Sequence, residues 1–183
     1  TLKVQNIQTS SGSGTITLGQ SGETIALGSG VTSKMNHPAF EATLTASQSI
    51  SDNVLTKVEF DNEIFDTDNC YDNTTNYRFT PNVAGKYLIT ATCRGDSQGD
   101  SQIQFHNTHI YKNGSSIARQ SQNFQANYPR VMNLPISYIV ELNGTTDYVE
   151  VYYLLNDTSG TPIITGTTSY GETYFSAYRI GVE

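Results

Sequence analysis

The stretch that decides the fold is YDNTTNYRFTPNVAGKY, residues 71–87. A short aromatic run at 77–80 ends at PNVAG, residues 81–85, which breaks the chain. From Lys86 onward the residues alternate, so that each face of a strand receives every second side chain. One row is Tyr87, Ile89, Ala91 and Cys93, and the other is Leu88, Thr90 and Thr92. Short strands between strong turn signals predict a sandwich or jelly roll.

The same alternation recurs along most of the chain, whereas helical periodicity is nearly absent. Asn-Gly pairs at 113–114 and 143–144 tolerate the positive φ that tight hairpins need. Only 15% of the residues are charged, and Asn, Thr, Ser and Gly carry the polarity, which is a poor composition for helices. We therefore expect an all-β fold with strands at residues 39–45, 55–65, 77–80, 86–93, 103–112, 115–120, 132–142, 148–155 and 172–182.

The charge balance argues against two classes of partner. The formal net charge is −7 and Lys and Arg form no cluster, so nucleic acid and anionic membrane surfaces are poor partners. No run of about 18 apolar residues exists, which excludes a membrane-spanning helix. The first residues, TLKVQ, lack the basic and apolar regions of a signal peptide. We expect no nucleic-acid partner and no membrane insertion.

Three of the predicted strands carry large apolar or aromatic residues on both faces. A sheet with one solvated face would have polar residues throughout its second row. Here the second row keeps Leu88, Tyr148, Tyr152 and Phe175. Two interpretations follow. Either a second subunit covers this row, or the tyrosines tolerate solvent and Phe175 is an ordinary core residue.

Several of these motifs together resemble the globular head of complement component 1q. VEFD at 58–61 and the stretch 71–87 are similar to that family's apolar-x-Phe-Asp strand, Tyr-Asp turn, Arg-Phe-Thr and Gly-x-Tyr strand. IYKNG at 110–114 resembles its next hairpin. YFSAY at 174–178 resembles its closing strand, with Ala177 where the family has Gly. The resemblance covers about residues 38–183, and it implies a ten-stranded jelly roll of the kind shared with tumour necrosis factor.

The resemblance also implies an assembly. In that family the sheet with the Gly-x-Tyr strand and the C-terminal strand lines the threefold axis of a homotrimer. Carried over to this chain, the trimer interface would hold Leu88, Thr90, Tyr148, Tyr152 and Phe175. Thr90 stands where an aromatic residue is common in the family. The polar run at 94–102 is expected to be a surface loop.

A two-copy repeat precedes the head. TITLG at 15–19 returns as TIALG at 24–28, and residues 1–33 contain no aromatic residue. Burying its few aliphatic side chains cannot offset the entropy of ordering about thirty backbone residues. The segment therefore pairs with the head, winds with copies of itself, or stays a flexible tether. We expect residues 1–36 to be a β-repeat shaft or anchor and residues 37–183 to be the head.

Candidate metal chemistry is confined to DTDNCYDN, residues 66–73. Tyr71 and Tyr77 stand where a calcium-binding EF-hand loop needs Gly and Glu, so that motif fails. Some complement-type heads bind calcium, so the resemblance leaves open a calcium site at Asp66, Asp68 and Asp72. The other interpretation is a solvated acidic turn. No other cofactor is expected.

Signatures of catalysis are missing. The chain has no Gly-x-Ser-x-Gly elbow, no P-loop and no Gly-x-Gly-x-x-Gly, so we expect that it is not an enzyme. Two cysteines, Cys70 and Cys93, are too few for a disulfide framework. We expect both to be free, with a single bridge between them as the alternative.

These expectations combine into one hypothesis about function. Complement-type heads are usually mounted on collagen, but no Gly-X-Y period occurs here. Gly/Ser/Thr-rich β repeats ahead of a jelly-roll head are instead similar to fibre, spike or decoration proteins of bacteriophage virions. We expect a non-enzymatic homotrimeric virion protein that residues 1–36 attach to capsid or tail proteins. It would stabilise a capsid or mediate attachment to a host surface glycan or protein. The alternative is a soluble complement-type recognition protein that binds carbohydrate or a protein ligand.

Overall fold

The computed structural model describes residue 29 and residues 37–99, 101–158, 161–167 and 171–181. The chain divides into two units between Met35 and Asn36, and the predicted shaft or anchor at 1–36 lies outside the described residues, apart from residue 29. All regular structure described is β, which confirms the predicted all-β class. In the described part of the chain there is no helix long and apolar enough to cross a membrane.

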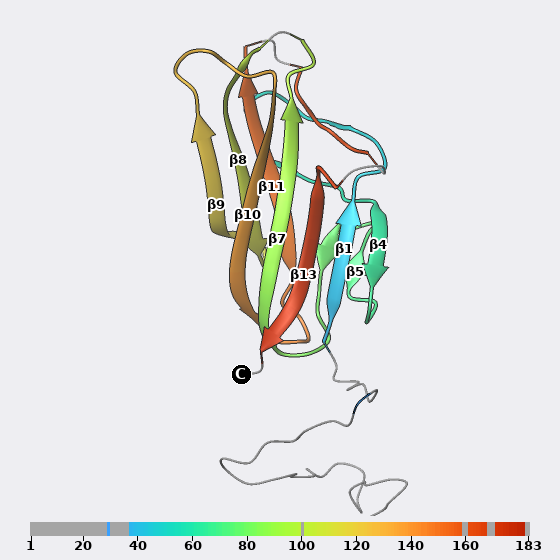
Figure 1. Ribbon diagram of the computed structural model, residues 1–183. Coiled ribbons are helices and arrows are strands. Elements are labelled where there is room, and N and C mark those ends of the chain that lie inside the picture. The colour runs from blue at the N-terminus through green and yellow to red at the C-terminus, as the bar shows by residue number, and fades with distance from the viewer. Residues whose placement is uncertain (1–28, 30–36, 100, 159–160, 168–170, 182–183) are drawn as a thin grey trace, which may run out of the picture. The chain divides into compact units, whose positions relative to one another are not determined.

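Two antiparallel sheets form a sandwich (Figure 1). Sheet A carries β10, β7, β13, β1 and β4 side by side, and β12 and β2 continue it beside the end of β7. Its strands are β1 (Ala39–Thr43), β2 (Gln48–Ser49), β4 (Asn62–Asp66), β7 (Gly85–Asp96), β10 (Val131–Leu142), β12 (Ile163–Ile164) and β13 (Tyr174–Gly181).

Sheet B lies against the inner face of sheet A. Its order is β5-β6-β11-β8-β9, and β3 also pairs with β11. Its strands are β3 (Thr56–Lys57), β5 (Tyr71–Asp72), β6 (Arg78–Phe79), β8 (Ile103–Lys112), β9 (Ser115–Asn123) and β11 (Val149–Asp157). The described residues thus form thirteen strands where ten were expected, and five of the thirteen are only two residues long.

The core lies between the sheets and follows the predicted alternation. The row Tyr87, Ile89, Ala91 and Cys93 is at most 1% exposed, and sheet B contributes Val149, Val151, Tyr153 and Leu155 at 0%. An aromatic cluster joins the sheets near β1, where the Phe40 ring packs on Tyr71 and Phe175 with centroids 4.4 and 4.8 Å apart. Both cysteines are buried and free, as expected from the sequence.

The two Asn-Gly pairs turn the chain in different ways. Asn113 and Gly114 have φ of 51° and 77° and join β8 to β9 as the tight hairpin that was predicted. Gly144 has the predicted positive φ, 70°, but this turn links β10 to β11, which belong to different sheets, so it forms no hairpin. There the Asn143 side-chain oxygen accepts the backbone N–H groups of Thr145, Thr146 and Asp147 at 2.9–3.0 Å. The loop is therefore closed by a side chain.

The prediction of a surface loop at 94–102 was only partly correct. β7 continues through Asp96 and pairs with β10 there, and Ser97 is 1% exposed. Gly95 allows this extension, because a Cβ at that position would collide with the Tyr153 hydroxyl and with Leu155 of sheet B. Pairing with β10 thus keeps residues 94–96 in the strand.

Candidate functional site

The outer face of sheet A carries exposed apolar side chains on three adjacent strands. Ile139 of β10 lies directly opposite Leu88 of β7, and Leu88 lies directly opposite Tyr178 of β13. They are 54%, 36% and 52% exposed, and Ile180, beside a β-bulge two residues further along β13, is 45% exposed. Neighbouring strands are about 4.8 Å apart, so these side chains form one patch. We call Leu88, Ile139, Tyr178 and Ile180 the apolar row.

Small hydroxyl side chains stand next to the apolar row. Ser137, Thr90 and Ser176 are opposite one another on the same three strands. Thr90 Oγ1 lies 2.7 Å from Ser176 Oγ. Because these two hydroxyls bond to each other, covering them would cost less than burying two unpaired hydroxyls.

Charged side chains stand at the two ends of this surface and not within it. At one end Lys86 of β7 is opposite Glu141 of β10. At the other end Arg94 forms an ion pair with Glu172. Between them, the outward-facing residues of β7, β10 and β13 are all uncharged. An uncharged centre bordered by charge is typical of a protein–protein interface.

The structure does not bring the five predicted interface residues together. Leu88 and Thr90 do face outward from sheet A. Tyr148 and Tyr152 belong to the other sheet, because β11 and the residues just before it pair with β8, β3 and β6. Phe175 lies opposite Ala91 in the inner row and is 0% exposed. The prediction of one shared face was therefore wrong, and the interpretation of Phe175 as a core residue is confirmed.

Sequence reasoning missed three members of the apolar row. Tyr178 and Ile180 alternate with Phe175 along β13, so placing Phe175 at the interface implied that these two side chains face inward. Alternation shows which side chains share a face but not which face is buried. Ile139 gave a weak signal, since its neighbours Tyr138 and Val140 are also large.

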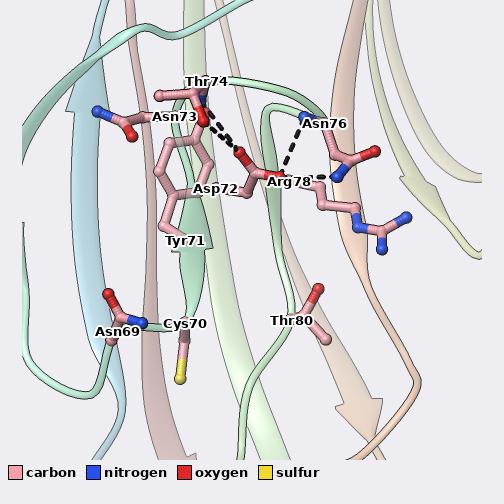
Figure 2. A pocket seen from close by; sticks show the side chains of 9 residues that line it. All are labelled: Asn69, Cys70, Tyr71, Asp72, Asn73, Thr74, Asn76, Arg78 and Thr80. Atoms are coloured by element: carbon pink, nitrogen blue, oxygen red, sulfur yellow. Dashed lines mark hydrogen bonds between the residues drawn. The ribbon is translucent and has the colours of Figure 1, made fainter.

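A polar pocket of about 370 Å³ lies at the hairpin between β5 and β6. Figure 2 shows Asp72 of β5 at its turn, bonded to Thr74 and Asn76. Its carboxylate accepts the N–H groups of Thr74, Thr75 and Asn76 at 2.9–3.1 Å. These bonds, the one from Thr75 above all, hold the pKa of Asp72 well below its ordinary value. The carboxylate thus stabilises the turn. The lining residues are Asn69, Cys70, Tyr71, Asp72, Asn73, Thr74, Asn76, Arg78 and Thr80.

The three carboxylates named as calcium ligands are engaged in separate turn contacts. Asp66 accepts the N–H groups of Asp68 and Tyr71 at 3.2 and 2.7 Å. Asp68 accepts the Thr67 hydroxyl at 2.9 Å, and Asp72 holds the next turn. Within the described ranges no group of three or more His, Cys, Asp or Glu side chains is placed to hold a metal ion. The structure does not gather the three into a site, and calcium binding there stays a prediction.

Comparison with known proteins identifies the fold. A crystal structure of murine APRIL at pH 5.0 aligns with a TM-score of 0.56 and 11% identity, over 79% of this chain and 100% of its own. Eiger TNF from S. frugiperda aligns with a TM-score of 0.54 and 7% identity, over 80% and 93%. The chain matches no protein-family model and no curated protein sequence. The jelly roll is thus of the tumour-necrosis-factor kind, and at these identities the likeness concerns the fold alone.

Proposed function

We propose that the chain is a non-enzymatic homotrimeric knob whose subunits meet through the outer face of sheet A. The apolar row carries this proposal. Four large side chains, each more than a third exposed, stand on adjacent strands with no charge between them. Scattered apolar residues are normal on a surface, but a continuous apolar patch marks an interaction site.

A second copy of the same chain is the partner we propose for this face. Closed cyclic symmetry gives every subunit the same environment and leaves no patch uncovered. A threefold arrangement is supported by the likeness of the fold to APRIL and Eiger and by the motifs in 58–61, 71–87 and 174–178 that resemble a trimeric head. Around a threefold axis, Leu88 of β7, the central strand of the patch, would approach its symmetry copies.

We propose a virion as the setting. The support comes from the repeat at 15–28, which has no collagen-like period and precedes a jelly-roll head. Three linked copies of residues 1–36 would attach one knob to a capsid or tail at three points, so avidity would strengthen a weak single contact. The role is then capsid stabilisation or host attachment without chemistry.

The assembly is tested by the mass of the protein in solution. Three chains of 20.1 kDa give about 60 kDa, and we expect trimers both for the full chain and for residues 38–183. Monomers in both would overturn the proposed assembly. A trimer only in the full chain would place trimerisation in residues 1–36 and contradict a subunit interface on the outer face of sheet A.

The virion setting needs a separate test. We expect mass spectrometry of purified particles of a virus whose genome encodes this chain to find it at a fixed ratio to the capsid or tail proteins, and electron microscopy to show threefold knobs. Absence from the particles would contradict the virion role and favour the recognition protein.

A further inference from the structure

Sheet B presents three half-buried tyrosines on its outer face: Tyr111, Tyr148 and Tyr152. The rings of Tyr111 and Tyr152 pack with centroids 4.3 Å apart and planes tilted by 36°. Tyr111 lies directly opposite Glu150, the residue midway between Tyr148 and Tyr152, so the three side chains are neighbours on this face. Burial raises the pKa of Tyr152. We call these residues the tyrosine cluster.

The hydroxyls of this cluster differ from those of the core tyrosines. Tyr71 donates to the Phe60 carbonyl at 3.0 Å, Tyr87 donates to the Val83 carbonyl at 2.6 Å, and Tyr153 bonds His106. By contrast, none of the cluster hydroxyls has a hydrogen-bond partner among the residues that the structure describes. Apolar ring surface and free hydroxyls are therefore exposed together on sheet B.

The charges beside the cluster are balanced. Lys57 Nζ lies 2.6 Å from Glu150 Oε1 and also donates to the Asn76 carbonyl at 3.1 Å. Arg78 stacks over the Tyr148 ring, 4.4 Å from its centroid, and Asp72 stands on the strand beside it. The two cations next to the tyrosines are thus matched by two anions, although the chain carries −7, and Arg119 of β9 lies one strand further out, opposite His109. A neutral ligand suits this surface better than an ionic one.

The polar pocket adjoins the tyrosine cluster. Arg78 belongs to both, since it lines the pocket and covers Tyr148. Figure 2 shows the amides of Asn73 and Asn76 and the hydroxyl of Thr80 around the same hairpin. The Asn73 and Asn76 amide nitrogens each donate one hydrogen bond within the protein, to the Asp61 carbonyl and to Asp72. Each amide keeps a second N–H and its oxygen, so it can still donate and accept. A binding surface with aromatic faces beside a few converging polar groups is typical of small-molecule sites.

We propose that the tyrosine cluster and the adjoining pocket bind a neutral oligosaccharide. A sugar ring has an apolar C–H face that packs on a tyrosine ring, and its hydroxyls both donate and accept at the edges. One sugar unit would rest on Tyr152 and Tyr111 while the next enters the pocket beside Arg78. This site uses the sheet opposite the proposed subunit seam, so it does not depend on the trimer.

The test uses the full chain and a panel of neutral oligosaccharides. The panel holds chains of three to six glucose, galactose, mannose or N-acetylglucosamine units, with sialylated chains as the acidic comparison. Saturation-transfer NMR identifies a binder and titration calorimetry gives its affinity. The variants are Tyr152→Ala, Tyr111→Ala and Tyr152→Phe. The control is Tyr138→Ala, which removes a tyrosine that is 43% exposed on β10. Thermal unfolding verifies that each variant is folded.

We expect a neutral oligosaccharide to bind with a millimolar or tighter dissociation constant. In each alanine variant the affinity for this oligosaccharide should fall about tenfold or more, because the variant loses a stacking face and a hydroxyl. Tyr152→Phe keeps the ring, so the affinity should fall by less. Tyr138→Ala should leave the affinity unchanged. No neutral binder, binding of acidic chains alone, or full affinity in both alanine variants would overturn the proposal. A monomeric protein that binds the sugar would contradict the trimer and leave this site standing.

Discussion

The Tyr153 hydroxyl lies 2.7 Å from Nδ1 of His106 between the two sheets. Both side chains are 0% exposed. The other ring nitrogen of His106 lies 3.4 Å from the Gln122 side-chain oxygen. Burial lowers the pKa of His106 and raises the pKa of Tyr153 well above its ordinary value. The sandwich therefore holds a neutral imidazole, and protonating it would place a charge in the interior.

This pair predicts that mild acid destabilises the fold. The pKa of His106 is lower in the folded chain than in the unfolded chain, so the folded chain binds fewer protons. The stabilisation is fully present above the unfolded pKa of about 6.5 and is lost as the pH falls below it. Urea unfolding should have a lower midpoint at pH 5.5 than at pH 7.5. His106→Gln should shrink this difference, and an undiminished difference would contradict the assignment.

Phe175 should behave as a core residue. Its ring is 0% exposed and packs against Phe40, Phe60 and Tyr71, with centroids 4.8, 5.7 and 5.9 Å away. Phe175→Ala leaves a cavity between the sheets, and we expect the free energy of unfolding to fall by about 3–5 kcal/mol. Urea titration at a fixed protein concentration measures this. A loss below about 1 kcal/mol would show that the ring is not buried as described.

The turn after β5 should depend on the Asp72 carboxylate. Asp72→Ala leaves the N–H groups of Thr74, Thr75 and Asn76 without their acceptor, so we expect a loss of about 1–2 kcal/mol in the free energy of unfolding. Because the pKa of Asp72 is lowered on folding, its contribution is present above the unfolded pKa of about 3.9 and is lost in stronger acid. The variant should therefore lose less stability than the parent between pH 5 and pH 3. Parallel acid dependence in both proteins would argue against this role.

Both thiols should be protected in the folded protein. Burial raises the pKa of Cys93 to about 12 and also raises that of Cys70, whereas the thiolate is the reactive form. We expect neither to react with iodoacetamide at pH 8 until urea unfolds the chain, when both should be alkylated. Mass spectrometry counts the added groups. Rapid labelling of Cys93 in the native protein would contradict its burial.

The fold could be predicted because its signals are local. Alternation along 86–93 placed Tyr87, Ile89 and Cys93 in one buried row, and Asn113-Gly114 marked a hairpin that the structure contains. Both signals depend only on side-chain direction and on φ. The turn chemistry of Asp72 was not foreseen, because a carboxylate in a polar run looks the same whether it binds backbone N–H groups, metal or water.

The residues that share the outer face of sheet A were predicted less well, because this face depends on long-range pairing. Tyr148 and Tyr152 have the same alternation as Leu88, but β11 pairs with β8 and not with β7. Ala91 opposite Phe175 and Leu88 opposite Tyr178 fix which face of β13 is buried. A shift of one residue in that register would exchange the two rows. Local sequence does not set this register, so Tyr148 and Tyr152 were assigned to the wrong sheet.

The most direct test of the proposed seam is the mass in solution of the full-length Leu88→Lys variant. Its control is Val54→Lys, which adds the same charge at an apolar residue that is 50% exposed outside both sheets. A lysine in the middle of the apolar row would bring three ammonium groups together at the axis, and an unpaired buried charge is strongly unfavourable. Light scattering should give about 60 kDa for the parent and for Val54→Lys, and the 20.1 kDa monomer for Leu88→Lys. A Leu88→Lys protein that stays fully trimeric would contradict the seam.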